Sequence, residues 1–211
     1  MGKVLVVNPN SSAVVTKGIA VALAPLGDCF EVTDLPDSPA TIASDEDVAR
    51  AGLGFLELAR GREDAAVFVT ACFSDPGLEL ARAAVTQPVI GVQEAGILTA
   101  LARADRFGII ALSPKSNPRH LRKMRMMGVE GRLAAELALD GVSAAASGTD
   151  PLVYEQVRGL AVQLGDMGAG AIVLGCAGMA PIRARLEAES GLAVIDPVVA
   201  AGAMALGIVK G

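Results

Sequence analysis

Short runs of apolar residues alternate along this chain with longer stretches in which apolar residues recur every three or four positions. The short runs are typical of buried strands and the longer stretches of amphipathic helices. We predict strands at 4–7, 30–33, 65–70, 89–92, 107–111, 171–174 and 193–195. Strands that alternate with helices indicate parallel sheets covered on both faces, so the predicted fold class is α/β.

The intervening stretches carry signals for where helices begin. Ser44-Asp45-Glu46-Asp47 has the pattern of a capping box, and Pro76 is expected to open a helix because proline fits the first turn. The segment 133–139 is ambiguous between strand and loop. The predicted helices cover 12–26, 44–60, a stretch from 76, 94–104, 117–127, 151–165, 181–189 and 197–209.

The two halves of the chain repeat the same landmarks in the same order. Asn10 matches Ser113, and Cys72 matches Cys176, at offsets of 103 and 104 positions. The run 88–91 matches 193–196 at an offset of 105. A steady offset indicates a duplicated unit, although α/β chains also repeat their texture by chance. We therefore expect two pseudo-symmetric parallel-sheet lobes with the active site in the cleft between them: 1–95 plus 196–211 in the first lobe and 96–195 in the second.

Composition narrows the possible functions. Of the 211 residues, 52% are hydrophobic and 3% aromatic, which permits a packed core and offers few stacking platforms for bases. A formal net charge of −5 disfavours nucleic-acid binding, and no apolar stretch is long enough to span a bilayer. The basic run 119–125, which includes His120, is interpreted as a solvated helix face. We expect a small-molecule substrate, a homo-oligomer, and no nucleic-acid or membrane partner.

Three cysteines at unrelated spacings indicate free thiols and a reducing, cytoplasmic location. Cys29 precedes a predicted strand, has no partner in the repeat, and is interpreted as structural. Cys72 and Cys176 each end an apolar strand and precede a turn, the position where open parallel sheets bind ligands. We expect the following helix to lower the pKa of each thiol.

Two thiols related by a pseudo-twofold axis can act as a pair of bases. One thiolate removes a proton from a carbon next to a carbonyl, and the other thiol returns a proton to the opposite face. No clustered His/Cys ligand set is present, so neither a metal nor an organic cofactor is expected. The alternative is that both are buried structural cysteines.

At these residues the sequence resembles the Asp/Glu/hydantoin racemase superfamily, and within it the hydantoin and allantoin racemases. The segments that carry the resemblance are 8–12, 71–78, 88–91 with 94–95, 174–179 and 196–198. The resemblance implies a two-lobed fold with catalytic Cys72 and Cys176. It also implies a substrate-binding set, in which Asn10 and Ser113 alternatively cap a helix or form a turn: Asn10, Phe73, Ser74, Ser113, Ala177 and Gly178.

The residues after the cysteines bear on the substrate. Amino-acid racemases of the superfamily have polar Asn-Thr and Thr-Glu pairs there, whereas this chain has Phe73 and Ala177-Gly178. Apolar or small neighbours suit a neutral ring, so the resemblance favours a 5-substituted hydantoin or allantoin. Leu112-Ser113 departs from the Thr-Thr pair common in hydantoin racemases, and the segment 130–139 does not resemble their pattern either.

Other functions stay open at this point. An aspartate or glutamate racemase would use the same two thiols, and a maleate isomerase-like enzyme would add one thiol to a double bond. An arylmalonate decarboxylase-like activity needs one cysteine, and Cys72 argues against it. A redox sensor would join Cys72 to Cys176 in a reversible disulfide. The run Gly168-Ala169-Gly170 precedes a strand, so it is not a dinucleotide-binding fingerprint.

Overall fold

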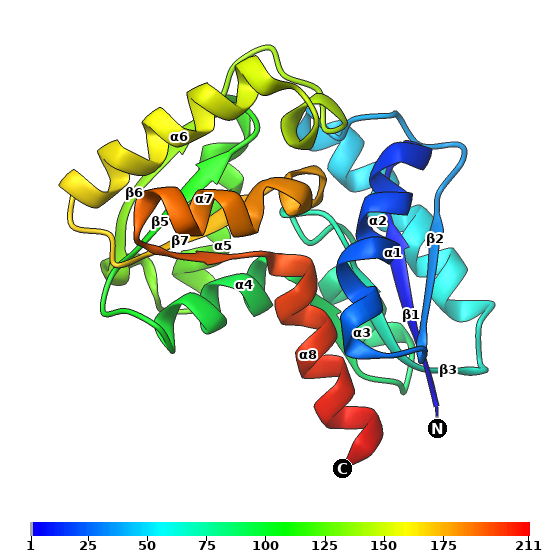
Figure 1. Ribbon diagram of the computed structural model, residues 1–211. Coiled ribbons are helices and arrows are strands. Elements are labelled where there is room, and N and C mark those ends of the chain that lie inside the picture. The colour runs from blue at the N-terminus through cyan, green and yellow to red at the C-terminus, as the bar shows by residue number, and fades with distance from the viewer. Residues whose placement is uncertain (1) are drawn as a thin grey trace.

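A computed structural model describes residues 2–211 and contains two four-stranded parallel sheets (Figure 1). The first sheet has the order β2-β1-β3-β4 and the second the order β6-β5-β7-β8, so the two halves share one topology. This confirms the predicted α/β fold with two parallel sheets. The strands are β1 (Lys3–Asn8), β2 (Phe30–Asp34), β3 (Ala65–Thr70), β4 (Val89–Gly91), β5 (Phe107–Ala111), β6 (Leu133–Ala138), β7 (Ala171–Gly175) and β8 (Ala193–Ile195).

Helices connect the strands in both halves. The capping box is present, since Ser44 Oγ accepts the N–H of Asp47 and the Asp47 carboxylate accepts the N–H of Ser44. The α-helices are α1 (Ala13–Leu23), α2 (Asp45–Arg60), α3 (Leu78–Ala84), α4 (Val92–Leu101), α5 (Asn117–Met126), α6 (Pro151–Asp166), α7 (Arg183–Ser190) and α8 (Pro197–Lys210).

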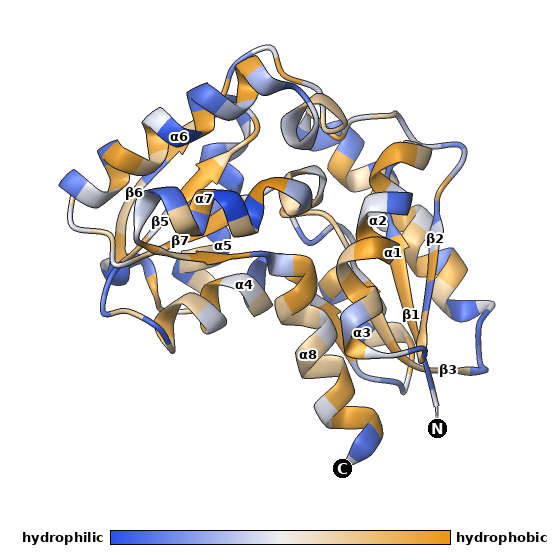
Figure 2. Ribbon diagram, viewed as in Figure 1, coloured by the Kyte–Doolittle hydropathy of each residue, from blue (hydrophilic) through white to orange (hydrophobic). Residues whose placement is uncertain are grey.

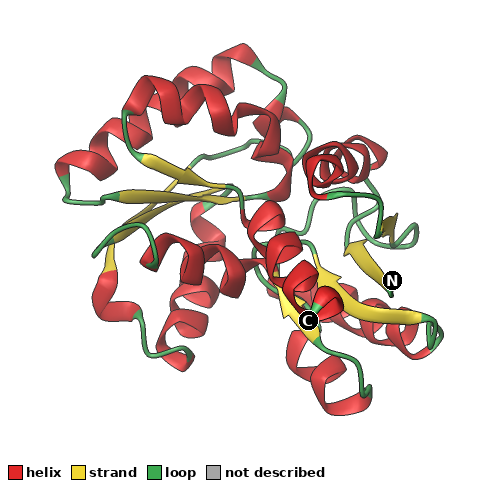
Figure 3. Cartoon of the chain, turned by 60° about the horizontal axis from the view of Figure 1, so that its bottom comes forward, coloured by secondary structure: helices red, strands yellow, loops and turns green. Residues whose placement is uncertain are grey.

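Each sheet is covered partly by a helix from the other half. Helix α4 leaves the first sheet after β4 and packs on β7 and β8, whereas α8 leaves the second sheet after β8 and packs on β1 and β3. The two helices also pack on each other, and the turned view shows α8 beside the first sheet (Figure 3). The apolar residues along α8 fit this buried position (Figure 2).

The core follows the apolar runs of the sequence. In β1 the side chains of residues 4–7 are fully buried, and β5 is buried along its whole length because helices cover both faces of these inner strands. The ambiguous segment 133–139 forms edge strand β6, whose half-buried residues explain its weak apolar signal. Among residues 2–211, no helix combines the length and the apolar character that crossing a membrane would require.

Three predicted helix starts are wrong by two residues, and one of them is that of α4, which begins at Val92 instead of residue 94. Helix α3 begins at Leu78, because Asp75 and Gly77 both have positive φ and form a turn after Cys72. Helix α7 begins at Arg183, because the segment Ala177–Ile182 forms a 3₁₀ helix that includes Pro181. Both turns follow a cysteine, so the chain departs from simple strand–helix connections at the two candidate catalytic positions.

Candidate active site

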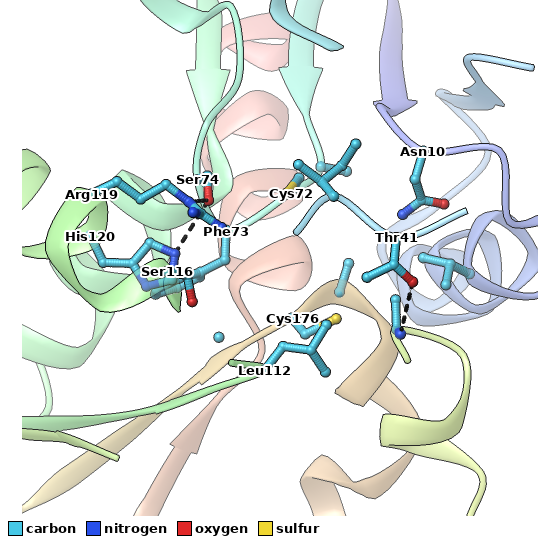
Figure 4. Close-up of a pocket in the computed structure, with 16 residues that line it drawn as sticks. Asn10, Thr41, Cys72, Phe73, Ser74, Leu112, Ser116, Arg119, His120 and Cys176 are labelled. Carbon is cyan, nitrogen blue, oxygen red and sulfur yellow. Dashed lines mark hydrogen bonds between the residues drawn. The ribbon is translucent and has the colours of Figure 1, made fainter. Parts of the chain in front are cut away.

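The carboxyl ends of β3 and β7 meet at one pocket between the two sheets (Figure 4). Cys72 follows β3 and Cys176 follows β7, and both side chains line this pocket. The other lining residues come from both halves of the chain: Asn10, Val15, Thr41, Ile42, Ala71, Phe73, Ser74, Leu112, Ser116, Arg119, His120, Ala144, Gly175 and Ala177.

The loop before α2 closes the pocket on one side. Thr41 Oγ1 accepts a hydrogen bond of 3.4 Å from the N–H of Ala144, which joins this loop to the segment that follows β6. Figure 4 shows Thr41 and Asn10 on the same side of the pocket. The pocket is therefore bounded by segments from both halves.

The backbone around Cys72 forms a tight turn. The N–H of Asp75 donates to the carbonyl of Cys72 at 2.8 Å, and the N–H of Ser74 points at the thiol. Burial raises the pKa of the Cys72 thiol to about 12, and the nearby Cys176 acts in the same direction. The N–H of Ser74 and the guanidinium of Arg119 act in the opposite direction.

The thiol of Cys176 has neutral hydrogen-bond donors from its own half. The N–H of Gly178 donates to Sγ at 3.4 Å, and Ser147 Oγ lies 3.9 Å from the same sulfur. Burial raises the pKa of this thiol, and both donors act against that rise. The expectation that the following helix lowers the two thiol pKa values is therefore wrong, because loss of solvation outweighs the backbone donors.

A cluster of polar side chains lies beside Cys72 (Figure 4). Arg119 Nε donates to Ser74 Oγ at 2.8 Å, and His120 Nε2 lies 3.3 Å from the same oxygen. His120 Nδ1 lies 2.6 Å from Glu136 Oε1, and the His120 ring packs edge-on against Phe73 at 5.1 Å.

The interpretation of Arg119 and His120 as part of a solvated helix face is wrong. The His120 side chain is 2% exposed and that of Arg119 is 11% exposed, because α5 packs this face toward the turn after Cys72. Arg122 and Arg125, on the other side of the helix, are exposed. Buried and exposed cations thus share α5, and the run of charges in the sequence does not distinguish them.

Of the predicted substrate-binding residues, Asn10, Phe73, Ser74 and Ala177 line the pocket with the cysteines. Asn10 Oδ1 accepts from Asn8 Nδ2 and from the N–H of Ser12, both at 2.9 Å. These bonds order the turn before α1 and leave the Asn10 amide nitrogen on the pocket side in Figure 4.

The structure places the two other predicted substrate-binding residues differently. Ser113 accepts from the N–H of Lys115 at 3.3 Å, begins a 3₁₀ turn, and lines a neighbouring pocket, while Leu112 faces the cysteines. Gly178 contacts Cys176 through its N–H and lines an outer groove beside α1. The substrate-binding roles of both residues stay predictions.

Two points remain, the third cysteine and the residues that could bind a metal ion. Cys29 is buried in the core with α1 and α8, as expected for a structural residue. In the described part of the chain, no three His, Cys, Asp or Glu side chains gather as a metal-ligand set.

Comparison with known proteins identifies the family. The model of the Asp/Glu/Hydantoin racemase family matches residues 4–205. The chain belongs to this family. A hydantoin racemase of Paenarthrobacter aurescens is 34% identical to this family member over 210 residues, which cover 94% of this chain and 87% of that protein. A hydantoin racemase of Pseudomonas sp. (strain NS671) is 35% identical over 209 residues, covering 94% and 82%.

A solved structure also resembles this racemase-family chain over its full length. The allantoin racemase from Klebsiella pneumoniae superimposes with a TM-score of 0.93 at 31% sequence identity and covers 100% of this chain and 88% of that one. The two-lobed racemase fold is thus present here.

The sequence did not reveal several lining residues of the racemase-family pocket. Thr41 and Ile42 lie in a loop without a motif, and Ser116 lies in a short 3₁₀ turn. Long-range packing brings these residues to the cysteines, and no spacing in the sequence reports that packing.

Proposed function

We propose that this chain is a cofactor-independent racemase of a 5-substituted hydantoin or allantoin, in which Cys72 and Cys176 act as paired bases. The observation that carries the proposal is that two thiols at matching strand ends line one pocket. The hydantoin and allantoin racemases named above are similar over nearly the whole chain, which supports the same class of substrate.

The proposed step balances without a redox change. One cysteine thiolate takes the proton from C5 of the ring, and the bonding electrons pass to the adjacent carbonyl as an enolate. The second thiol then gives its proton to the opposite face of C5 and becomes the thiolate. A thiol whose pKa is raised by burial is a strong base once ionised, and this suits removal of a carbon-bound proton.

Apolar residues directly after the two cysteines favour a neutral ring over a free amino acid. Phe73 and Ala177 are apolar, and the N–H groups near them are suited to a developing enolate oxygen. The one guanidinium in the pocket, Arg119, already donates to Ser74 Oγ and Asp45 Oδ1. It therefore has limited capacity to bind the carboxylate of aspartate or glutamate.

The test is loss of optical rotation with single enantiomers of a 5-alkylhydantoin, allantoin, aspartate and glutamate, with maleate isomerisation followed separately. We expect racemisation of at least one ring substrate in reducing buffer, above the spontaneous rate. Racemisation of only the amino acids would replace the substrate assignment. Turnover of maleate alone would favour an isomerase, and a reversible Cys72–Cys176 disulfide without turnover would favour a redox sensor.

A further inference from the structure

Helix α5 belongs to the second half of the chain but contacts the turn that follows Cys72 in the first half. Arg119 and His120 both contact Ser74 Oγ, at 2.8 and 3.3 Å. Arg119 also donates to Asp45 Oδ1 and to the carbonyl of Ala43, at 3.2 and 3.4 Å. The turn after Cys72 is thus held by side chains from across the pocket.

Two hydrogen-bond directions in this cluster are fixed by chemistry. A carboxylate only accepts, so the Glu136 contact at 2.6 Å places a proton on His120 Nδ1. Arg119 Nε only donates, so Ser74 Oγ accepts from it. Ser74 Oγ thus accepts from Arg119 Nε and lies 3.3 Å from His120 Nε2, so both side chains hold it in place.

The order serine, histidine, carboxylate is also that of hydrolase triads, but one contact argues against a nucleophilic Ser74. Arg119 occupies a lone pair of Ser74 Oγ, and a charge-assisted hydrogen bond to that oxygen lowers its nucleophilicity. The arrangement is better suited to hold the backbone of the turn, whose Ser74 N–H faces the Cys72 thiol.

Among residues 2–211, the turn after Cys176 receives no side-chain hydrogen bond from the other half, although α1 packs against it. Gly178 stands at the position that matches Ser74 and has no side chain. The donors to Cys176 are the N–H groups of Gly178 and Met179 and the hydroxyl of Ser147, and all three belong to the second half. The charged groups that act on Cys72 are Arg119 and Asp75, whereas the groups nearest Cys176 are neutral.

We propose that Arg119 and His120 are positioning residues for Cys72 alone: acting through Ser74, they set the reactivity of this thiol and leave that of Cys176 unchanged. The catalytic consequence rests on the proposed function, because each thiol would serve one enantiomer. Loss of either residue would then slow proton removal from one enantiomer more than from the other.

The test measures alkylation of each cysteine by iodoacetamide at pH 8 in the full-length protein, with peptide mass spectrometry to separate the sites. For Arg119→Gln we expect Cys72 to react about three- to tenfold more slowly, since tenfold corresponds to one pKa unit, and Cys176 to change less than about twofold. Arg122→Gln, on the exposed side of the same helix, is the matched control and should change neither rate.

His120→Gln is the second variant, because it cannot contact Ser74 and Glu136 in the same way and should also slow Cys72 selectively. Equal slowing of both cysteines, or an unchanged Cys72, in folded Arg119→Gln and His120→Gln would overturn the proposal. Solvent deuterium exchange into each hydantoin enantiomer provides the catalytic readout. A different outcome is that the variants slow alkylation of Cys72 selectively while the wild-type protein exchanges neither enantiomer. That result would refute the proposed function and leave the positioning role standing.

Discussion

The helices that follow the fourth strand of each sheet are capped in different ways. At the start of α8, Asp196 accepts the N–H groups of Val198 and Val199 at 2.8 and 3.4 Å. At the start of α4 the corresponding residue is Gly91, which has no side chain to do this. The carboxylate of Asp75, from the turn after Cys72, takes its place.

Asp75 accepts the N–H of Gln93 at 2.8 Å and that of Glu94 at 3.2 Å. A Cβ on Gly91 would overlap the Asp75 carboxylate, so the glycine makes room for this group. The comparison shows that the first cysteine turn is joined to the helix that packs on the opposite sheet. The second cysteine turn has no part in capping α8, so only the first cysteine turn is tied to the start of such a helix.

The strongest test of the comparison removes each thiol. We expect Cys72→Ser and Cys176→Ser each to lower racemisation by about 10³-fold or more, because serine is far too weak an acid to replace a thiol base near neutral pH. Each variant should still exchange the proton of one enantiomer, and the two variants should differ in which one. The measurement is deuterium exchange into each pure enantiomer of a 5-substituted hydantoin, with spontaneous exchange subtracted.

Exchange of the same enantiomer by both cysteine variants would contradict the two-base assignment. Racemisation by either variant near the wild-type rate would contradict it too, and single-cysteine chemistry would then be favoured.

Gly91→Ala should break the cap of α4. The added Cβ displaces the Asp75 carboxylate from a buried position, and we expect the free energy of unfolding to fall by about 2–4 kcal/mol in urea titrations. Gly159→Ala, at an exposed position of α6 where a Cβ meets nothing within 4 Å, is the control and should stabilise by about 0.5–1 kcal/mol.

The cap that Asp196 forms on α8 can also be built at the matching position of α4. The double variant Gly91→Asp with Asp75→Gly places the carboxylate on the helix itself, and the glycine suits the backbone φ of 45° at position 75. We expect it to recover at least half of the stability lost in Gly91→Ala. Equal stability of the double variant and Gly91→Ala would show that the cap is not what Gly91 protects.

Asp75→Asn should change how stability depends on pH. Burial raises the pKa of the Asp75 carboxyl to about 7, while the N–H of Gln93 and the Lys123 ammonium act against the rise. Between about pH 4 and pH 7 the unfolded chain has lost a proton that the folded chain keeps, so this group makes the folded state less stable as pH rises. Relative to wild type, Asp75→Asn should gain about 1–3 kcal/mol between pH 4.5 and pH 7.5.

Urea unfolding at the two pH values measures this gain. Asp196→Asn is the matched comparison in the second half and should show a gain of the same sign, because burial also raises the pKa of Asp196. A difference between wild type and Asp75→Asn that is constant with pH would contradict the prediction.

The smallest expected effect concerns the donor beside Cys176. Ser147 Oγ lies 2.8 Å from the Ala144 carbonyl and 3.9 Å from Cys176 Sγ, so its one hydrogen can turn to the sulfur when the thiol ionises. Ser147→Ala should raise the pKa of Cys176 and slow its alkylation about two- to threefold, with Cys72 unchanged. An equal effect on both cysteines would show that Ser147 supports the pocket as a whole.

The fold could be predicted largely because local signals agreed with the global arrangement. The strands at 65–70, 107–111 and 193–195 were predicted to the residue at their start, since buried parallel strands are continuous apolar runs. The steady offset of matching landmarks in the two halves, Cys72 and Cys176 among them, predicted two similar sheets. The edge strand β6 was ambiguous because its residues are only half-buried.

The parts of the candidate site that were missed depend on contacts between distant segments. His120 pairs with Glu136 and contacts Ser74 only because α5 packs across the pocket. The periodicity of apolar residues within α5 carries no information on these distant partners. The expected direction of the two thiol pKa shifts is wrong for the same reason. The sequence shows a nearby helix start but not the depth of burial, which for Cys72 decides the direction.

The exchange of α4 and α8 between the sheets has a consequence for folding. A fragment ending after β4 would expose the face of β1 and β3 that α8 covers, and a fragment of the second half without α4 would expose β7 and β8. Neither half therefore has a complete core of its own, and denaturation should run as one cooperative transition. Two separate copies of such a half-length unit would complete each other's cores by exchanging their last helices in a twofold dimer. Fusion of the two copies into one chain would make this exchange permanent.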